Sequence, residues 1–208
     1  MQLEFYKYQG TGNDFVVIDD RMHQFDVTDE QKIRKICDRK KGIGADGLIL
    51  LRKHADADFE MLYFNADGKE GTMCGNGGRC LVDFAHYLEV IKDDCTFIAI
   101  DGIHKAKWTE KSVALKMIDV FEVEVNKSFV YLDTGSPHYV QFVKDLETYP
   151  VFERGKSIRY NERFKKYGTN VNFVEIKGSK CSVRTYERGV EDETLSCGTG
   201  VTAVAIAA

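Results

Sequence analysis

Two cysteines of the sequence lie in nearly identical surroundings and could carry acid–base chemistry. Cys74 lies in the segment 70–77 (EGTMCGNG) and Cys197 in the segment 193–200 (ETLSCGTG), so both fit the pattern E-x-x-x-C-G-x-G. An apolar pattern with helical spacing follows each segment. We therefore predict that each thiol lies at the N-terminus of a helix.

The N-terminus of a helix is a favourable place for an anion. Its first N–H groups have no partner within the helix, and the helix dipole places about half a positive charge there. Glycines let a ligand approach the backbone closely. Such a site stabilises a thiolate or a bound carboxylate. A cysteine in solution has a pKa of about 8.5, so modest help makes it useful for proton transfer near neutral pH.

Two such cysteines indicate a different reaction from one. A single cysteine would indicate a covalent nucleophile, whereas inversion of a carbon centre needs a base on one face and an acid on the other. The two roles exchange when the reaction runs in reverse, which two similar thiols from two similar domains would allow. Both helix N-termini could also hold the substrate carboxylate and stabilise the carbanion. The other cysteines are expected to be buried structural side chains: Cys37, Cys80, Cys95 and Cys181.

The elements that would position these thiols form two similar halves. In the first half, alternating apolar patterns predict strands at 3–8, 15–19, 48–51, 59–64, 96–100, 104–109 and 113–117. Turns are predicted at 9–14 and 65–68. Helices are predicted at 28–38, where Thr28 and Gln31 fit a capping box, and at 78–90.

The second half repeats this plan. Strands are predicted at 121–125, 129–132, 139–143, 171–176 and 182–186, with a hairpin turn at 177–179. The segment 151–163 is ambiguous and fits a short helix followed by a loop. A helix is predicted from about Val201. We therefore predict two domains, 1–115 and 116–208. The apolar segment 201–208 ends within a helical pattern without a cap, so we expect the second half to be truncated.

Composition narrows the class of protein. Hydrophobic residues make up 43% of the 208 residues and charged residues 30%, which is typical of a globular protein. The net charge is -4 and no basic block occurs, so neither nucleic acid nor an anionic membrane is expected as a partner. No apolar run could span a bilayer, and no signal peptide is evident. We expect a cytoplasmic protein with reduced thiols. The Cys and His spacings fit no metal site.

Several motifs together resemble the diaminopimelate epimerase family. They cover almost the whole chain and occur in the family's order: 10–15 (GTGNDF), 42–47 (GIGADG), 65–68 (NADG), 73–80 (MCGNGGRC), 135–138 (GSPH), 168–173 (GTNVNF), 186–189 (YERG) and 197–200 (CGTG). The resemblance implies an α/β (α+β) fold of two pseudo-symmetric domains. Each would be a curved, mostly antiparallel sheet around a central helix, with the active site in the cleft between the domains. It also implies cofactor-independent interconversion of LL- and meso-diaminopimelate, a step of lysine and peptidoglycan precursor biosynthesis.

The resemblance also implies roles for single residues. Cys74 and Cys197 would be the two-base pair, and His138 and Glu187 polar neighbours that help the thiols exchange protons. The helix starts that clamp the reacting carboxylate would be Gly75, Asn76, Gly198 and Thr199. Residues that bind the substrate, largely at its non-reacting end, would be Asn13, Asn65, Ser136, Asn170, Glu187 and Arg188. Ser136 stands where many members have asparagine, and Gly47 where some have a glutamine.

The chemistry of the substrate supports these roles independently. Its far end is a second amino-acid group, which needs a cation for the carboxylate and acceptors for the ammonium group. Arg188 offers a bidentate fork, and the asparagines offer both donors and acceptors. The expected partner is therefore diaminopimelate, and a homodimer remains an option.

Two other interpretations stay open. One is a proline or hydroxyproline racemase-like isomerase of the same superfamily. The other is a cysteine-based redox switch, in which Cys74 and Cys197 form a regulatory disulfide. Arg188 and the asparagines favour a substrate with a second charged end, and so favour the epimerase.

Overall fold

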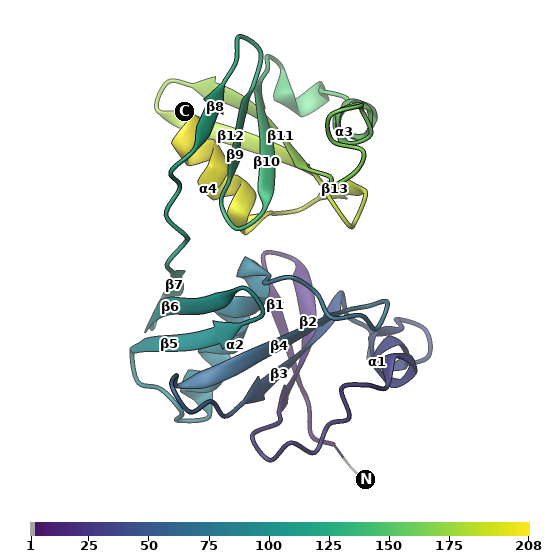
Figure 1. Ribbon diagram of the computed structural model, residues 1–208, viewed down its shortest axis with the longest axis vertical. Coiled ribbons are helices and arrows are strands. Elements are labelled where there is room, and N and C mark those ends of the chain that lie inside the picture. The colour runs from purple at the N-terminus through teal and green to yellow at the C-terminus, as the bar shows by residue number, and fades with distance from the viewer. Residues whose placement is uncertain (1–2) are drawn as a thin grey trace. The chain divides into compact units, whose positions relative to one another are not determined.

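The chain folds into two compact units. The structure, a computed structural model, describes residues 3–208. The first unit ends at Lys116 and the second begins at Met117, one residue beyond the expected boundary. Within the described residues, each unit holds one mixed sheet with an α-helix against either face (Figure 1).

The first unit is built on a seven-stranded sheet whose spatial order follows the sequence. Its strands are β1 (Tyr6–Gly10), β2 (Asn13–Asp19), β3 (Gly47–Arg52), β4 (Phe59–Asn65), β5 (Asp94–Ala99), β6 (Gly102–Thr109) and β7 (Ser112–Leu115). The pairs β2–β3 and β4–β5 are parallel, and the other neighbours are antiparallel. Each parallel pair needs a crossover connection. Helix α1 (Glu30–Cys37) supplies the first and helix α2 (Gly75–Tyr87) the second.

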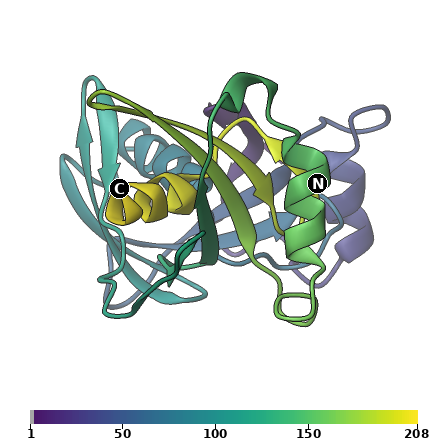
Figure 2. The same ribbon diagram turned by 90° about the horizontal axis from the view of Figure 1, so that it is seen from above.

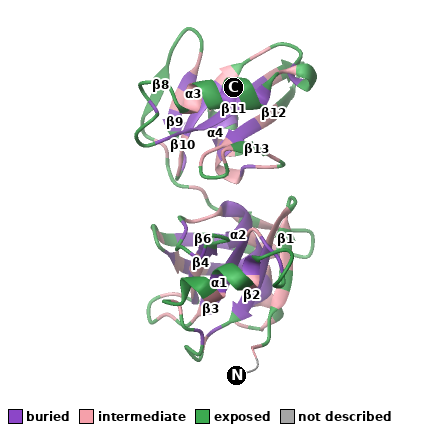
Figure 3. Ribbon diagram, turned by 90° about the vertical axis from the view of Figure 1, so that its right-hand side faces the viewer, coloured by how far each residue is buried: buried purple, intermediate pink, exposed green. Residues whose placement is uncertain are grey.

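Helices α1 and α2 cover opposite faces of this sheet. Phe15 and Val17 of β2 pack in the core that α2 covers, whereas Val16 and Ile18 pack in the core that α1 covers. Successive strand residues point to opposite faces, so burial on both faces gives the continuous apolar run of this strand. Strands β2 and β3 are accordingly buried along most of their length (Figure 3).

The second unit is built on a six-stranded sheet in the order β13-β12-β11-β10-β9-β8. Its strands are β8 (Val123–Val125), β9 (Val130–Asp133), β10 (Pro137–Phe142), β11 (Asn170–Lys177), β12 (Lys180–Glu187) and β13 (Asp192–Thr194). Only β10 and β11 pair in parallel within the described sheet. Their crossover contains a 3-10 turn, η1 (Leu146–Thr148), and helix α3 (Val151–Arg159). Helix α4 (Gly198–Ala207) follows β13 and lies across the sheet from α3 (Figure 2).

The two units repeat one connectivity. In each, a hairpin leads through a crossover helix to a parallel strand, then to an antiparallel strand, a cysteine loop and a second helix. In the first unit this order is β1-β2-α1-β3-β4-α2, and in the second it is β9-β10-α3-β11-β12-α4, with the short β13 added before the loop. The repeat confirms the predicted fold class of two similar α/β units with mostly antiparallel sheets.

Some local predictions were wrong. The N-cap of α1 is Asp29, whose side chain accepts a hydrogen bond from the Lys32 amide, whereas Thr28 bonds instead to Asp26. The predicted turn at 9–14 is only two residues long, because Thr11 and Gly12 adopt φ angles of 55° and 86°. Positive φ at both central positions is typical of a tight type I′ hairpin. Consequently β1 extends to Gly10 and β2 begins already at Asn13.

Helix α3 packs so closely on β12 that it leaves no room for a side chain at Gly155. A Cβ atom there would lie 2.3 Å from Cβ of Tyr186. We expect Gly155→Ala to lower the free energy of unfolding by about 1–3 kcal/mol because the helix must move off the strand. Urea unfolding measures this, with the exposed Ser157→Ala on the same helix as the control. An unchanged or higher stability of Gly155→Ala would contradict the packing.

Candidate active site

Both motif cysteines are the residues at which a helix begins. Cys74 is the N-cap of α2, with φ −109° and ψ 116°, and Cys197 is the N-cap of α4, with φ −124° and ψ 110°. The structure thus confirms that each thiol lies at a helix N-terminus. The helices begin at Gly75 and Gly198, three residues before the predicted starts. The predicted starts were late because glycine has a low helix propensity, so a first turn that contains glycines is not recognised as helical from the sequence.

Asn13 connects the Cys74 thiol to a charged network. The Sγ of Cys74 donates a hydrogen bond to Oδ1 of Asn13 over 3.6 Å. The Nδ2 of Asn13 in turn donates to Oδ2 of Asp46 over 2.7 Å. The turn between β1 and β2 and the loop before β3 together position this contact. The Asp46 amide donates to the carbonyl oxygen and the carboxylate of Asp14, and the Asp14 amide donates to the carboxylate of Asp46.

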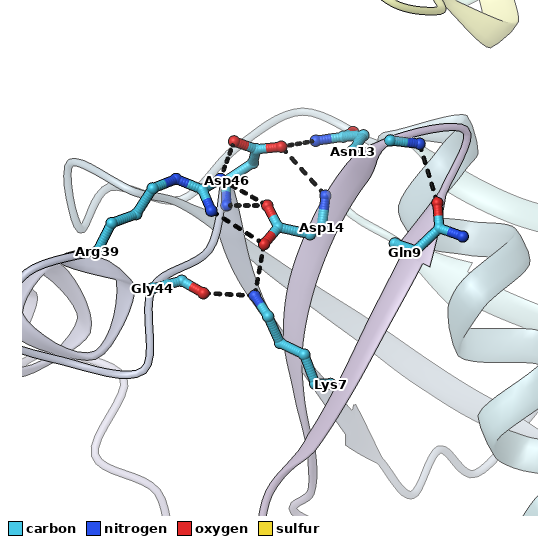
Figure 4. A network of polar contacts seen from close by, with 8 residues as sticks. Lys7, Gln9, Asn13, Asp14, Arg39, Gly44 and Asp46 are labelled. Carbon is cyan, nitrogen blue, oxygen red and sulfur yellow. Dashed lines mark hydrogen bonds and ion pairs between the residues drawn. The ribbon is translucent and has the colours of Figure 1, made fainter.

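The network behind Asn13 contains two acidic and two basic side chains (Figure 4). Arg39 donates to Asp14 over 2.6 Å and to Asp46 over 2.8 Å. Lys7 forms a 2.6 Å ion pair with Asp14 and also contacts the carbonyl oxygen of Gly44. Sequence reasoning did not assign Asp46 or Arg39 to the site, although the 42–47 motif includes Asp46.

The pKa of Asp14 lies well below its usual range. Partial burial acts to raise this pKa, but hydrogen bonds and charge from Arg39 and Lys7 outweigh burial and lower it. A lowered native pKa contributes stability that is present above the unfolded-state pKa, about 3.9, and is lost as the pH falls toward the native value. The network therefore stabilises the fold at neutral pH and loses that effect in acid.

We expect Asp14→Asn to lower the free energy of unfolding by about 1–3 kcal/mol at pH 7, because Lys7 loses its carboxylate partner and Arg39 keeps only Asp46. The difference from the wild type should shrink as the pH falls from 5 to about 2. Urea unfolding at several pH values measures this. Glu124→Gln breaks an exposed pair with Arg163, and should have a much smaller effect because water screens that pair. A pH-independent difference for Asp14→Asn would contradict this interpretation.

The other predicted binding residues of the first unit lie near Cys74 along the chain. Asn76 is buried in the first turn of α2, where its Oδ1 accepts hydrogen bonds from Arg79 and from Thr11. Gly75 is also buried in that turn. Asn65 ends β4 and pairs with Gly47. A Cβ on Gly47 would lie 2.5 Å from the Tyr63 ring, so glycine is the residue that fits beside Tyr63.

Cys197 lies at the end of a chain of hydrogen bonds in the second unit. Its Sγ lies 3.5 Å from Oγ1 of Thr199, and Nε2 of His138 lies 2.9 Å from the same oxygen. Nδ1 of His138 lies 3.0 Å from Nδ2 of Asn172, whose Oδ1 accepts from Thr185 over 3.0 Å. The structure thus joins three predicted residues, Cys197, Thr199 and His138.

His138 is fully buried, and burial together with the charge of Arg188 lowers its pKa to about 3. The imidazole is therefore neutral near neutral pH. A neutral ring carries one proton, so one nitrogen donates and the other accepts. His138 can then orient its neighbours through hydrogen bonds without adding a positive charge.

The remaining predicted residues of the second unit form a second polar group. Asn170 donates to Oγ of Ser136 over 2.9 Å and accepts from the Arg188 amide, and the Arg188 guanidinium lies 3.5 Å from the same serine oxygen. Glu187 accepts a 2.7 Å hydrogen bond from Thr194. This group borders the Cys197 chain, because Asn170 pairs with His138 across β10 and β11. Ser136 therefore bonds to the neighbouring arginine and asparagine.

Sequence reasoning missed Asn172 and Thr185 as members of the Cys197 chain. Both are buried and directly opposite each other on β11 and β12. The available signal was a polar residue in a strand that is otherwise apolar, since the 168–173 motif alternates asparagine with valine and phenylalanine. A buried amide needs hydrogen-bond partners, and the strand register supplies them.

Three of the other four cysteines are buried as predicted. They are Cys37, Cys80 and Cys95, and burial raises their pKa values to about 11, 12 and 11. Such thiols stay protonated near neutral pH. The prediction for Cys181 was wrong: this residue is exposed on β12, whose first three residues, 180–182, are all exposed.

In residues 3–208, no group of three or more His, Cys, Asp or Glu side chains is placed to hold a metal ion. Within the same range, none of the helices is long and apolar enough to cross a membrane.

Solved structures with the same fold include a PhzF-family phenazine biosynthesis protein of Bacillus anthracis. It matches with a TM-score of 0.74 and 16% identity, over 100% of this chain and 80% of its own. A hydroxyproline epimerase from Agrobacterium vitis matches with a TM-score of 0.69 and 14% identity, over 99% of this chain and 76% of its own. At these identities the likeness concerns the fold alone.

Sequence comparison identifies much nearer relatives. The family model described as diaminopimelate epimerase matches residues 5–120 and 130–208. A protein of Flavobacterium psychrophilum named diaminopimelate epimerase is 54% identical over 207 residues, covering 99% of this chain and 81% of the relative. The protein of that name from Chlorobaculum tepidum is 47% identical, covering 95% of this chain and 80% of the relative. With both motif cysteines at helix N-termini and these relatives across nearly its whole length, the chain belongs to the diaminopimelate epimerase family.

Proposed function

We propose that this protein interconverts LL- and meso-diaminopimelate by two proton transfers, with Cys74 and Cys197 as the acid–base pair and without a cofactor. The observation that carries the proposal is the placement of the two cysteines as N-caps of α2 and α4. The similarity to proteins named diaminopimelate epimerase supports the choice of substrate.

The chemistry follows from the two thiols. One thiolate takes the proton from the α-carbon, so the C–H bond breaks and an S–H bond forms. The electron pair left on carbon is delocalised into the adjacent carboxylate. The other thiol then gives its proton to the opposite face of that carbon, which inverts the centre. In the reverse direction the two cysteines exchange roles.

The helix N-termini would lower the energy of the carbanion intermediate. N–H groups of the first turns of α2 and α4 lack partners within their helices, and they can donate to the carboxylate as negative charge builds on it. Gly75 and Asn76 would supply such groups on α2, and Gly198 and Thr199 on α4. No large side chain at the glycines blocks the approach of the substrate.

The second polar group would hold the far end of the substrate. Arg188 offers a guanidinium to a carboxylate, and Asn170 places an amide beside it. Ser136 and Glu187 complete this group in the second unit, and we assign Asn13 and Asn65 to substrate binding in the first. Reduced thiols are required throughout, which fits a reducing compartment such as the cytoplasm.

The alternatives from the sequence are less well supported. A proline or hydroxyproline racemase shares the fold, but its likeness rests on identity of only 14%. Relatives above 45% identity carry the epimerase name. A redox switch would not need a substrate-binding group such as Ser136, Asn170 and Arg188.

Incubation with diaminopimelate in heavy water tests the proposal. We expect the α-proton signal to disappear from the NMR spectrum, and the substrate to gain deuterium, without added pyridoxal phosphate. Proline is the matched control and should not exchange. Absence of exchange with diaminopimelate would refute the proposed function, and exchange with proline alone would favour the racemase.

A further inference from the structure

The loop that follows β12 contains a glutamate in an unfavourable backbone conformation. Glu191 has a φ angle of 59°, in the left-handed region that glycine, and less often asparagine or aspartate, adopts. Another residue stays in this region only where the surrounding contacts hold it there. Arg188 lies three residues earlier in the same loop. Whatever holds Glu191 therefore also holds the backbone beside a proposed substrate-binding residue.

The carboxylate of Glu191 joins the loop to the end of α3 and to β12. Its Oε1 accepts hydrogen bonds from Nε of Arg159 and from the amide of Gly189, both over 3.2 Å. Its Oε2 accepts a hydrogen bond from the hydroxyl group of Tyr186 over 3.3 Å. A further hydrogen bond, from the hydroxyl group of Tyr160 to this carboxylate, raises the pKa of that tyrosine.

The backbone of the loop is closed by hydrogen bonds on both sides of Arg188. The Glu191 amide donates to the carbonyl oxygen of Glu187 over 2.8 Å. Gly189, whose amide binds the Glu191 carboxylate, has a φ angle of 91°, so two residues of this short loop lie in the left-handed region. The Arg188 amide itself donates to Oδ1 of Asn170 over 2.9 Å. The conformation of segment 187–191 thus depends on Glu191.

The ion-pair partner of Glu191 also lies close to the side chain of Arg188. Both arginines lie against Gly168, because a Cβ atom there would be 2.6 Å from Cδ of Arg188 and 2.9 Å from Cζ of Arg159. The side chain of Arg159 is only 14% exposed, so water screens the repulsion between the two guanidinium groups only in part. The Glu191 carboxylate offsets the charge of Arg159 and so removes this repulsion.

We propose that Glu191 is a positioning residue for Arg188, and that it holds the loop 187–191 against α3 so that the guanidinium group of Arg188 faces the far carboxylate of the substrate. This role depends on the proposed function, which assigns Arg188 to substrate binding. The far carboxylate does not react, so its contacts are the same in the ground state and the transition state. Loss of such contacts raises KM and leaves kcat nearly unchanged.

Steady-state kinetics of Glu191→Gln tests this role. Glutamine keeps the size and the acceptor oxygen of glutamate but not its charge, so the ion pair with Arg159 is lost. We expect the KM for diaminopimelate to rise about tenfold and kcat to change by less than about twofold. A merely structural defect would instead reduce the fraction of active protein, which lowers kcat at an unchanged KM.

Glu124→Gln is the matched control. It also breaks a glutamate–arginine pair of the second unit, with Arg163. Glu124 belongs to β8, at the opposite edge of the sheet from β13, and the loop of Glu191 leads into β13. The KM of this variant should stay within about twofold of the wild-type value, because exposed pairs contribute little.

Two further variants separate the carboxylate from the backbone and from Arg188. Glu191→Gly removes the carboxylate, and glycine adopts the positive φ without strain, so this variant should fold and should also show a raised KM. In an Arg188→Gln background, Glu191→Gln should lower kcat/KM by less than about twofold, compared with about tenfold in the wild-type background. Two substitutions that act through one residue are not additive.

Hydrogen–deuterium exchange of the ligand-free protein tests the loop without any reaction. Peptide mass spectrometry follows the amides of segment 187–191. We expect these amides to exchange about 3–10-fold faster in Glu191→Gln than in the wild type, because the loop opens more often without the ion pair. Glu124→Gln should leave their exchange unchanged.

An unchanged KM in both Glu191→Gln and Glu191→Gly would overturn the positioning role, as would a tenfold loss of kcat/KM that persists in the Arg188→Gln background. Unchanged amide exchange in a protein that epimerises diaminopimelate would reject this role alone. Faster amide exchange in Glu191→Gln, with no epimerisation by the wild type, would reject the proposed function and would leave the hold of Glu191 on the loop supported.

Discussion

Cys74→Ser and Cys197→Ser are each expected to lower the rate of epimerisation by about 10²–10⁴-fold, because serine does not ionise near neutral pH and general acid–base catalysis contributes factors of this size. Either substitution removes one of the two proposed proton carriers, so inversion should stop in both directions. The rate is measured by following conversion of LL- to meso-diaminopimelate by chiral chromatography.

Cys181→Ser is the matched control for both variants. Cys181 is exposed on β12, and its replacement should leave the rate unchanged. Far-UV circular dichroism of all three variants checks that the fold is retained. Full activity in either Cys74→Ser or Cys197→Ser would refute the two-base mechanism.

Gly200→Ala is expected to lower the turnover rate by about 10²-fold, because small displacements of catalytic groups have effects of that size. A Cβ at position 200 would lie 2.5 Å from Oδ1 of Asn172 and 3.2 Å from Cβ of Cys197. The amide must then move, which breaks its hydrogen bond from Thr185 and the chain that reaches Thr199. Steady-state kinetics measures the loss, and urea unfolding should show a destabilisation of about 1–3 kcal/mol.

Gly77 provides a matched control, because it occupies the equivalent position of the first C-G-x-G segment. A Cβ there would meet the ends of two flexible side chains, Cδ1 of Ile49 at 2.9 Å and Cε of Met61 at 3.3 Å. These can rotate away, so Gly77→Ala should reduce turnover by less than about threefold. Equal losses in the two variants would show that the hydrogen-bond chain of Asn172 is not responsible.

The sequence was most informative where one strong local signal was enough. The cysteine segments predicted both helix N-termini because glycines followed by an apolar periodic pattern have few other interpretations. Strand β3 was predicted almost to its ends by its apolar run. The N-cap of α1 was harder to predict, since Thr28 and Asp29 are both good N-cap residues and Thr28 bonds to Asp26 instead.

Features that depend on pairing between distant segments were not predictable in the same way. Strand β13 is three residues long and contains two acidic side chains, so it has no pattern of its own and exists because β12 lies beside it. Asp46 hydrogen-bonds to Asn13 and Asn172 to His138, so neither residue contacts a thiol directly in these hydrogen-bond chains. Their positions follow from strand register, which a single sequence does not specify.

Residues of β2 belong alternately to the two cores of the first unit, and this arrangement predicts how the unit unfolds. Phe15 and Val17 belong to the core under α2, while Val16 and Ile18 belong to the core under α1. Every peptide group of this segment is thus held between two apolar layers, and neither layer can loosen without disturbing the backbone of the other. The amides of β2 should therefore exchange with solvent only through a single cooperative opening of both layers. Cys74 and its helix accordingly share their stability with helix α1 on the opposite face of the sheet.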